Sequence, residues 1–173
     1  MTEINANLSL IGDQFKDANS LKEFNLILDH PNFSGEKVIE FLSQDQRLNS
    51  LFEADAGLNR PLSIKTHTKR VYAVYADQLP YYELKNAKLP GDFSIERLFR
   101  FFISIHDIGK PLAIAIDGNK DLQHKYTAPI IENLMKKLEF QNEAIHLTKT
   151  LVDNDVLGDF LKTDISQKHA SEK

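Results

Sequence analysis

The stretch from Ile95 to Pro111, IERLFRFFISIHDIGKP, decides the fold of this chain of 173 residues. Its apolar residues recur every three or four positions, which places their side chains on one face of an α-helix. The helix runs directly into His106 and Asp107. Gly109 and Pro111 follow at once and are expected to end it. We therefore predict a central apolar helix that ends at two polar side chains.

Helical spacing of apolar residues extends along almost the whole chain. No two strand-like runs are joined by a hairpin dipeptide, so the sequence predicts an all-α fold. Ser34 is placed to cap one of the shorter helices, and Pro80 to Asp92 is the main irregular segment, which we expect to lie over a pocket. Besides the central helix, the predicted helices cover about residues 21–28, 38–42, 64–78, 124–138 and 143–161.

Length and composition indicate one structural domain of an ordinary soluble protein. The chain has 21 basic and 25 acidic side chains, a net charge of -4 and 42% hydrophobic residues. We divide it into an N-terminal helical extension (1–62) packed on the core, a core (63–162) and a frayed polar tail (163–173).

Composition also excludes several kinds of chemistry and partner. The chain has no cysteine, which rules out thiolate catalysis, cysteine-bound metals and disulfides. A pI of about 5.9 argues against binding of extended nucleic acid, which needs clustered basic side chains. No apolar run approaches the ~20 residues of a membrane span, and no signal peptide is present, so a cytoplasmic location is the default expectation. The oligomeric state cannot be read from the sequence.

Four polar residues fall on or beside the apolar face of different predicted helices: His67, His106, His124 and Asp155. A polar side chain that faces a core must be paired or bound, because burying it unsatisfied costs about 1–3 kcal/mol. One metal ion would satisfy several of them together. Asp153, Asp155 and Asp159 all compete as ligands near the C-terminus, and Asp155 is chosen because it follows Leu151 by one helical turn.

These residues resemble the H…HD…D pattern of the HD-domain metal-dependent phosphohydrolases. His67 precedes His106 by 39 residues, and Asp155 follows Asp107 by 48. The resemblance covers about residues 63–161 and implies an HD-domain-like helical bundle. It also implies His67, His106, Asp107 and Asp155 as metal ligands. The departures from the pattern of the branches that cleave cyclic-di-GMP or alarmones imply a small stand-alone member.

The expected activity is hydrolysis of a small phosphate ester, most plausibly a nucleotide. The cofactor would be one or two divalent ions, of Mn, Fe, Co, Ni, Zn or Mg, one of which activates water. Asp107 and Lys110 are the expected catalytic residues. Lys110 is also the expected substrate-binding cation beside the ligands, and Arg70 is a second candidate for contact with phosphate. His124 remains open between a second metal ligand, a substrate contact and a structural residue.

Two other functions remain open at this point. The same helices could hold two redox-active irons, with His124 as a ligand, as in the oxygenase branch of the superfamily. Alternatively, the fold could serve as a non-catalytic interaction module whose first 60 residues bind a partner.

Overall fold

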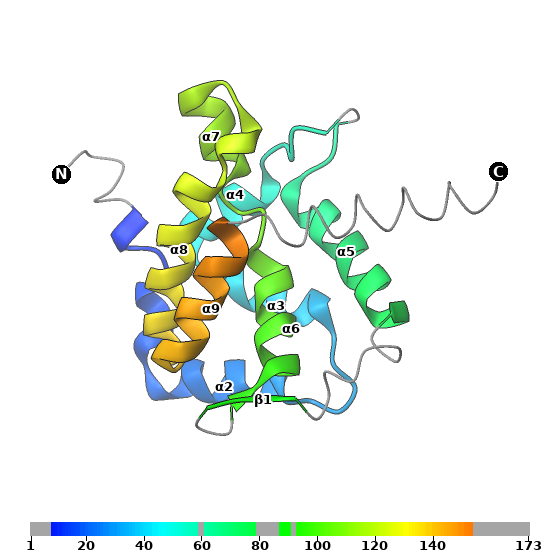
Figure 1. The fold of residues 1–173 in the computed structure, drawn as a ribbon, viewed down its shortest axis with the longest axis vertical. Helices are drawn as coiled ribbons and strands as arrows, with labels where there is room; N and C mark the ends of the chain where they lie inside the picture. The colour runs from blue at the N-terminus through cyan, green and yellow to red at the C-terminus, as the bar shows by residue number, and fades with distance from the viewer. Residues whose placement is uncertain (1–7, 59–60, 79–86, 91–92, 154–173) are drawn as a thin grey trace.

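The computed structural model describes residues 8–58, 61–78, 87–90 and 93–153. These residues form a mainly helical fold with one small sheet (Figure 1). The all-α prediction is therefore confirmed except for that sheet. In chain order, the elements are η1 (Asp13–Lys16), α2 (Ala18–Leu28), α3 (Gly35–Leu42), α4 (Gln46–Glu53), α5 (Ile64–Gln78), β1 (Lys88–Leu89), β2 (Phe93–Ser94), α6 (Ile95–Ile105), α7 (Lys110–Asp117), η4 (Lys120–Leu122), α8 (His124–Lys137) and α9 (Asn142–Asp153).

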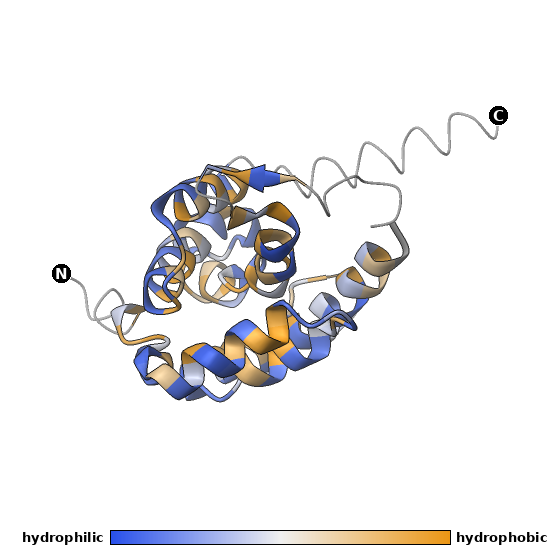
Figure 2. Ribbon diagram, turned by 90° about the horizontal axis from the view of Figure 1, so that it is seen from below, coloured by the Kyte–Doolittle hydropathy of each residue, from blue (hydrophilic) through white to orange (hydrophobic). Residues whose placement is uncertain are grey.

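One hydrophobic cluster joins residues from the N-terminal helices to residues from α6, α8 and α9. The ring of Phe24 on α2 is its clearest junction, because its centroid lies 5.3 Å from that of Phe41, 5.8 Å from that of Phe101 and 6.1 Å from that of Phe140. Figure 2 shows hydrophobic and hydrophilic segments alternating along the helices, as expected of amphipathic helices around a shared core. Residues before and after position 63 therefore share one core.

Helix α5 is fixed against α3, α4 and α6. The Tyr72 ring covers Gly35, where an added Cβ would lie 2.5 Å from the Tyr72 Cδ1 atom, so only glycine fits there. The Tyr72 hydroxyl donates a hydrogen bond to the carbonyl of Arg100 on α6. On the outer side, Lys65 pairs with Glu53 of α4 at 2.9 Å. These contacts fix the position of α5 relative to α6.

The first described residues are bound to α8. The Nδ2 atom of Asn133 donates hydrogen bonds to the carbonyls of Leu8, Ser9 and Ile11 at 3.0–3.1 Å. The ammonium of Lys137 donates to the carbonyls of Ser9 and Ile11, both at 2.6 Å. These bonds hold the backbone just before η1 against α8.

The sheet was not predicted. Lys88–Leu89 pairs antiparallel with Phe93–Ser94, so the described residues are mainly but not wholly helical. Strands of two residues are too short to show the alternating pattern by which strands are read from sequence. The predicted irregular segment, Pro80 to Asp92, contains β1 but not β2, and residues 79–86 and 91–92 lie outside the described residues, as does the predicted polar tail.

Two helices were also missed, and one predicted cap is not made. Helix α4 was not predicted, and neither was α7, because Pro111 was taken only as the end of the central helix. Proline in the first turn of a helix loses no hydrogen bond, and Pro111 occupies that position in α7. Ser34 stands at the N-cap of α3, but its side chain makes no capping hydrogen bond.

Candidate metal centre

Two histidines and one aspartate from α5 and from the turn after α6 converge at one point. The Nε2 atom of His67 lies 3.0 Å from Oδ2 of Asp107. The Nε2 atom of His106 lies 3.4 Å from the same oxygen. One ligating atom from each residue lies within 4.8 Å of the others. The structure therefore brings together three of the residues that the sequence predicts as metal ligands.

The end of α6 orients the His106 ring. Helix α6 ends at Ile105, and His106 begins the turn that leads into α7. The Nδ1 atom of His106 lies 2.8 Å from the carbonyl oxygen of Ile103. A carbonyl only accepts hydrogen bonds, so Nδ1 carries a hydrogen and Nε2 is the atom turned to Asp107. Metal-binding histidines are commonly oriented in this way by a backbone carbonyl.

His67 lies at the edge of the buried face of α5. That face runs through Ile64, Thr68 and Tyr72, which are buried, whereas Val74 is exposed. The apolar face predicted from the spacing instead runs through Ile64, His67, Val71 and either Val74 or Tyr75. The shift by one residue leaves His67 half-buried, where it reaches Asp107 from the side that faces solvent.

Asp107 is the charged centre of the cluster. Its Oδ2 atom also accepts a hydrogen bond from Nζ of Lys110 at 2.5 Å, a contact that the sequence analysis did not anticipate, although the two residues are three apart in a tight turn. Burial alone would raise the pKa of Asp107, but His106, His67 and Lys110 outweigh it and hold the pKa well below its usual range. For His106, burial alone would lower the pKa, but the Asp107 carboxylate outweighs this effect, so the pKa of His106 is raised. The Asp107 side chain is therefore a carboxylate anion at neutral pH.

Exposure increases outward across the cluster. The side chain of Asp107 is 4% exposed, that of His106 13% and that of His67 23%. Lys110, at 15%, also has a partly exposed side chain. The carboxylate thus forms the base of the cluster, and the imidazole of His67 is the part most open to a small ion or ligand.

The donor set fits a metal ion. Two imidazole nitrogens and a carboxylate oxygen are typical ligands of divalent transition metals. In the parts of the chain that the structure describes, His67, His106 and Asp107 are the group of histidine and acidic side chains placed closely enough to hold one. The prediction that the protein holds a metal is therefore supported at the level of a possible site, whereas the identity of the ion is not.

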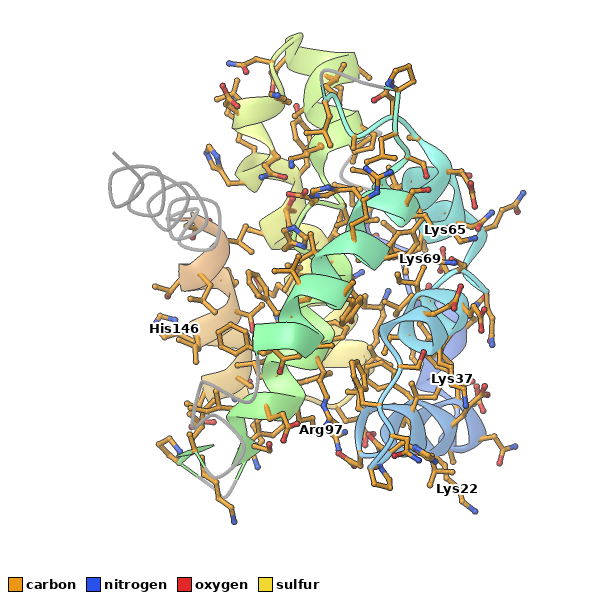
Figure 3. The ribbon with its side chains drawn as sticks, turned by 90° about the vertical axis from the view of Figure 1, so that its right-hand side faces the viewer. Lys22, Lys37, Lys65, Lys69, Arg97 and His146 are labelled. Carbon is orange, nitrogen blue, oxygen red and sulfur yellow. The ribbon has the colours of Figure 1, made fainter. Side chains whose placement is uncertain are left out.

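The remaining predicted site residues stand apart from this group. His124 is half-buried and begins α8, and it does not belong to the cluster. Arg70 is exposed on α5, one turn after His67. His146 on α9 is exposed, and Figure 3 shows it at one edge of the molecule, away from Lys65 and Lys69 of α5.

Asp155 lies outside the described residues, which end with α9. Phe140, just before α9, lies against Phe101, with ring centroids 4.8 Å apart, and α9 packs on α6. Figure 1 shows α9 ending toward the end of α6 that leads into α7. The buried face of α9 includes Thr148 and Val152, whereas the predicted face, through Leu147 and Leu151, is only half-buried.

The sequence analysis missed a contact beneath the cluster. The backbone N–H of Gly109 donates a hydrogen bond to the Thr127 hydroxyl at 3.0 Å. Nothing in the sequence links Thr127 to this turn, because Gly109 and Thr127 are 18 residues apart and are brought together by the packing of the turn on α8. A separate groove of about 630 Å³ runs along α2, past Leu21, Asn25 and Asp29, and shares no residue with the cluster.

No protein-family model, curated protein or solved structure matches this chain. None of the described helices combines the length and the apolar character needed to cross a membrane. The fold and the cluster together define a mainly helical protein with a histidine and aspartate group that can hold a metal ion.

Proposed function

We propose that this protein is a metal-dependent phosphohydrolase that cleaves a small phosphate ester, such as a nucleotide. The observation that carries the proposal is the convergence of His67, His106 and Asp107, with the ammonium of Lys110 against the same carboxylate. A ligand group beside a fixed cation suits a substrate that is itself an anion. The H…HD…D resemblance of the sequence supports the same activity.

In this proposal, His67, His106 and Asp107 hold one divalent ion, and Asp155 is the fourth ligand. A divalent ion in such a site lowers the pKa of bound water from ~16 towards ~7 and polarises a phosphoryl oxygen. The hydrogen bond between His106 and Ile103 keeps the imidazole in the orientation that binding needs. The buried Asp107 supplies the negative charge that holds the ion.

Lys110 binds the substrate phosphate in this mechanism. Its ammonium is the cation nearest to Asp107 and remains partly exposed, so it can contact an anion on the solvent side of the cluster. It would stabilise the negative charge that grows on the phosphoryl oxygens in the transition state. Arg70 on the exposed face of α5 is a second contact for an extended substrate, and His124 is a candidate contact for the leaving group.

The proposal is tested by elemental analysis of the purified protein beside His106→Ala and His146→Ala. The parent and the His146→Ala variant are expected to retain a transition metal and to release phosphate from some member of a panel of nucleotides and phosphate esters. His106→Ala is expected to lose both, because it removes one nitrogen of the cluster. His146 is the matched control, since it is an exposed histidine on α9 outside the cluster.

The other outcomes point to other functions. Two irons per chain with oxygen consumption and no phosphate release would overturn the phosphohydrolase in favour of an oxygenase. No metal in the parent protein, even after metal supplementation, would overturn both and would leave an interaction module.

Replacing Lys110 with methionine is expected to preserve the bound metal and to lower phosphate release by about 100-fold to 1000-fold, the usual loss when one preorganised donor is removed. Methionine keeps the length of the side chain without its charge. The measurement is kcat with the best ester of the panel, together with metal content. Lys125→Met is the control, because Lys125 is an exposed lysine 3.8 Å from Asp117 on the neighbouring helix. If Lys110→Met kept the same activity as Lys125→Met and the parent, a role for Lys110 in the reaction would be excluded.

A further inference from the structure

The turn that carries two of the proposed ligands rests on the first turns of α8. The turn joins α6 to α7 and includes His106, Asp107 and Gly109. A Cβ added to Gly109 would lie 2.5 Å from the backbone nitrogen of Thr127 and 2.7 Å from the carbonyl oxygen of Gln123. Real Cβ atoms are not found so close to backbone atoms, so only glycine allows this approach.

A hydrogen bond fixes the turn at this close distance. The Gly109 N–H donates to Thr127 Oγ1 at 3.0 Å, and both residues are buried. The Thr127 side chain is fully buried, so no water replaces its hydroxyl without rearrangement of the core. The contact therefore ties the backbone two residues after Asp107 to a separate helix.

The other supports of the Asp107 side chain belong to the site itself. Its described side-chain contacts are with His67, His106 and Lys110, which are the residues that a bound ion and substrate would engage. His106 has an independent support in the Ile103 carbonyl. Outside the site, Ile108 next to Asp107 is buried in the core and its N–H donates to the Ile105 carbonyl, and the Gly109–Thr127 bond adds the described side-chain anchor to α8. The backbone that carries the carboxylate is thus held from α6 on one side and from α8 on the other.

We infer that Thr127 is a positioning residue of the metal centre, which sets the place of the Asp107 carboxylate through the Gly109 N–H. The inference rests on the proposed metal site and goes beyond it by assigning a role to a residue that touches neither ion nor substrate. Outer-shell hydrogen bonds of this kind typically change metal affinity by about 10-fold to 100-fold. Loss of the hydroxyl frees the turn to move relative to His67, which comes from another helix.

The test is titration of the metal-free protein with Co²⁺, followed by visible absorption, in the parent and in Thr127→Val, Thr127→Ser and Thr148→Val. Valine keeps the shape of threonine without the hydroxyl, so Thr127→Val is expected to bind Co²⁺ about 10-fold to 100-fold more weakly, with an altered absorption spectrum. Serine keeps the hydroxyl, so Thr127→Ser is expected to bind as the parent does. Thr148 is also fully buried, and its hydroxyl donates to the Ala144 carbonyl within α9, so Thr148→Val should lose stability without losing affinity.

Each outcome decides between the hypotheses. If Thr127→Val binds Co²⁺ as tightly as the parent, the positioning role is wrong and the metal site stands. If Thr127→Ser is as weak as Thr127→Val, the hydroxyl is not the cause and the inference is wrong. If Thr148→Val weakens binding to the same extent, the effect is one of general stability and the inference is wrong. If the parent binds no Co²⁺, the metal site and the inference fail together. Thermal unfolding of each variant confirms that it is folded at the temperature of the titration.

Discussion

Asp107→Ala is expected to lose the bound metal and the phosphate-releasing activity together. Asp107 is the negatively charged member of the described cluster, and its Oδ2 atom is the one that His67, His106 and Lys110 all approach. The loss of metal affinity should exceed the roughly 100-fold that is typical of an outer-shell partner, because a ligand itself is removed. The measurements are metal content by elemental analysis and phosphate release with the metal supplied in excess.

Asp107→Asn separates loss of charge from loss of folding. Neither variant supplies the negative charge that pairs with Lys110, but the amide keeps the shape of the carboxylate and an oxygen that accepts hydrogen bonds, whereas alanine removes both. Both variants should lose the metal, and Asp107→Asn should unfold at the higher temperature. A fully active Asp107→Asn variant would contradict the proposed role of the carboxylate.

Asp153→Ala is the control for this experiment and also tests the choice of face on the last helix. Asp153 is exposed at the end of α9, so its removal is expected to leave the metal content and the activity unchanged. Asp155→Ala is expected to weaken metal binding. If Asp153→Ala lost as much bound metal as Asp155→Ala, the predicted ligand face of the last helix would be wrong.

Phe24→Ala is expected to lower the free energy of unfolding by about 3–5 kcal/mol, the usual cost of removing a buried aromatic ring. For a chain of this size, that corresponds to a fall in melting temperature of roughly 6–20 °C. The loss should be large because Phe24 is fully buried and contacts rings from α3, from α6 and from the segment before α9. Chemical denaturation followed by circular dichroism measures it.

Leu26→Ala is the matched control on the same helix. Leu26 is 63% exposed, so its truncation should change the free energy of unfolding by no more than about 0.5 kcal/mol. A similar loss from both variants would mean that α2 packs differently from the arrangement described above. A loss of stability in Phe24→Ala with two separate transitions would show that the N-terminal helices fold independently of α6.

The helices that pack at the centre were predictable from the sequence, and the short elements were not. The apolar spacing around Phe102 and Leu134 is strong because those side chains face the core, and α6 and α8 occur where it predicts them. The hairpin at Lys88–Leu89 and the helix that begins at Lys110 leave weaker signals. Two-residue strands have no measurable period, and α7 is apolar but partly exposed, so its pattern does not mark a buried face.

The candidate site was predictable to the extent that its residues lie on helices with a clear period. His67, His106 and Asp107 come together as expected, because the end of α6 and the first turn of α5 lie side by side. The ion pair between Lys110 and Asp107 depends on the shape of a turn, and the bond between Gly109 and Thr127 depends on how two helices pack. The first is a local contact between residues three apart, which the spacing could have suggested, whereas the second is a tertiary contact that no residue spacing encodes. Asp155 stays a prediction.

The attachment of the N-terminal residues to α8 has a consequence for the order in which the chain folds during synthesis. The carbonyls of Leu8, Ser9 and Ile11 bind Asn133 and Lys137, which are 122–128 residues later in the chain. At ribosomal rates these partners are made roughly 6–25 seconds after the N-terminal turn. The turn before η1 therefore reaches these hydrogen bonds only after α8 has been made, so a nascent chain that still lacks α8 does not yet hold this turn against the rest of the fold.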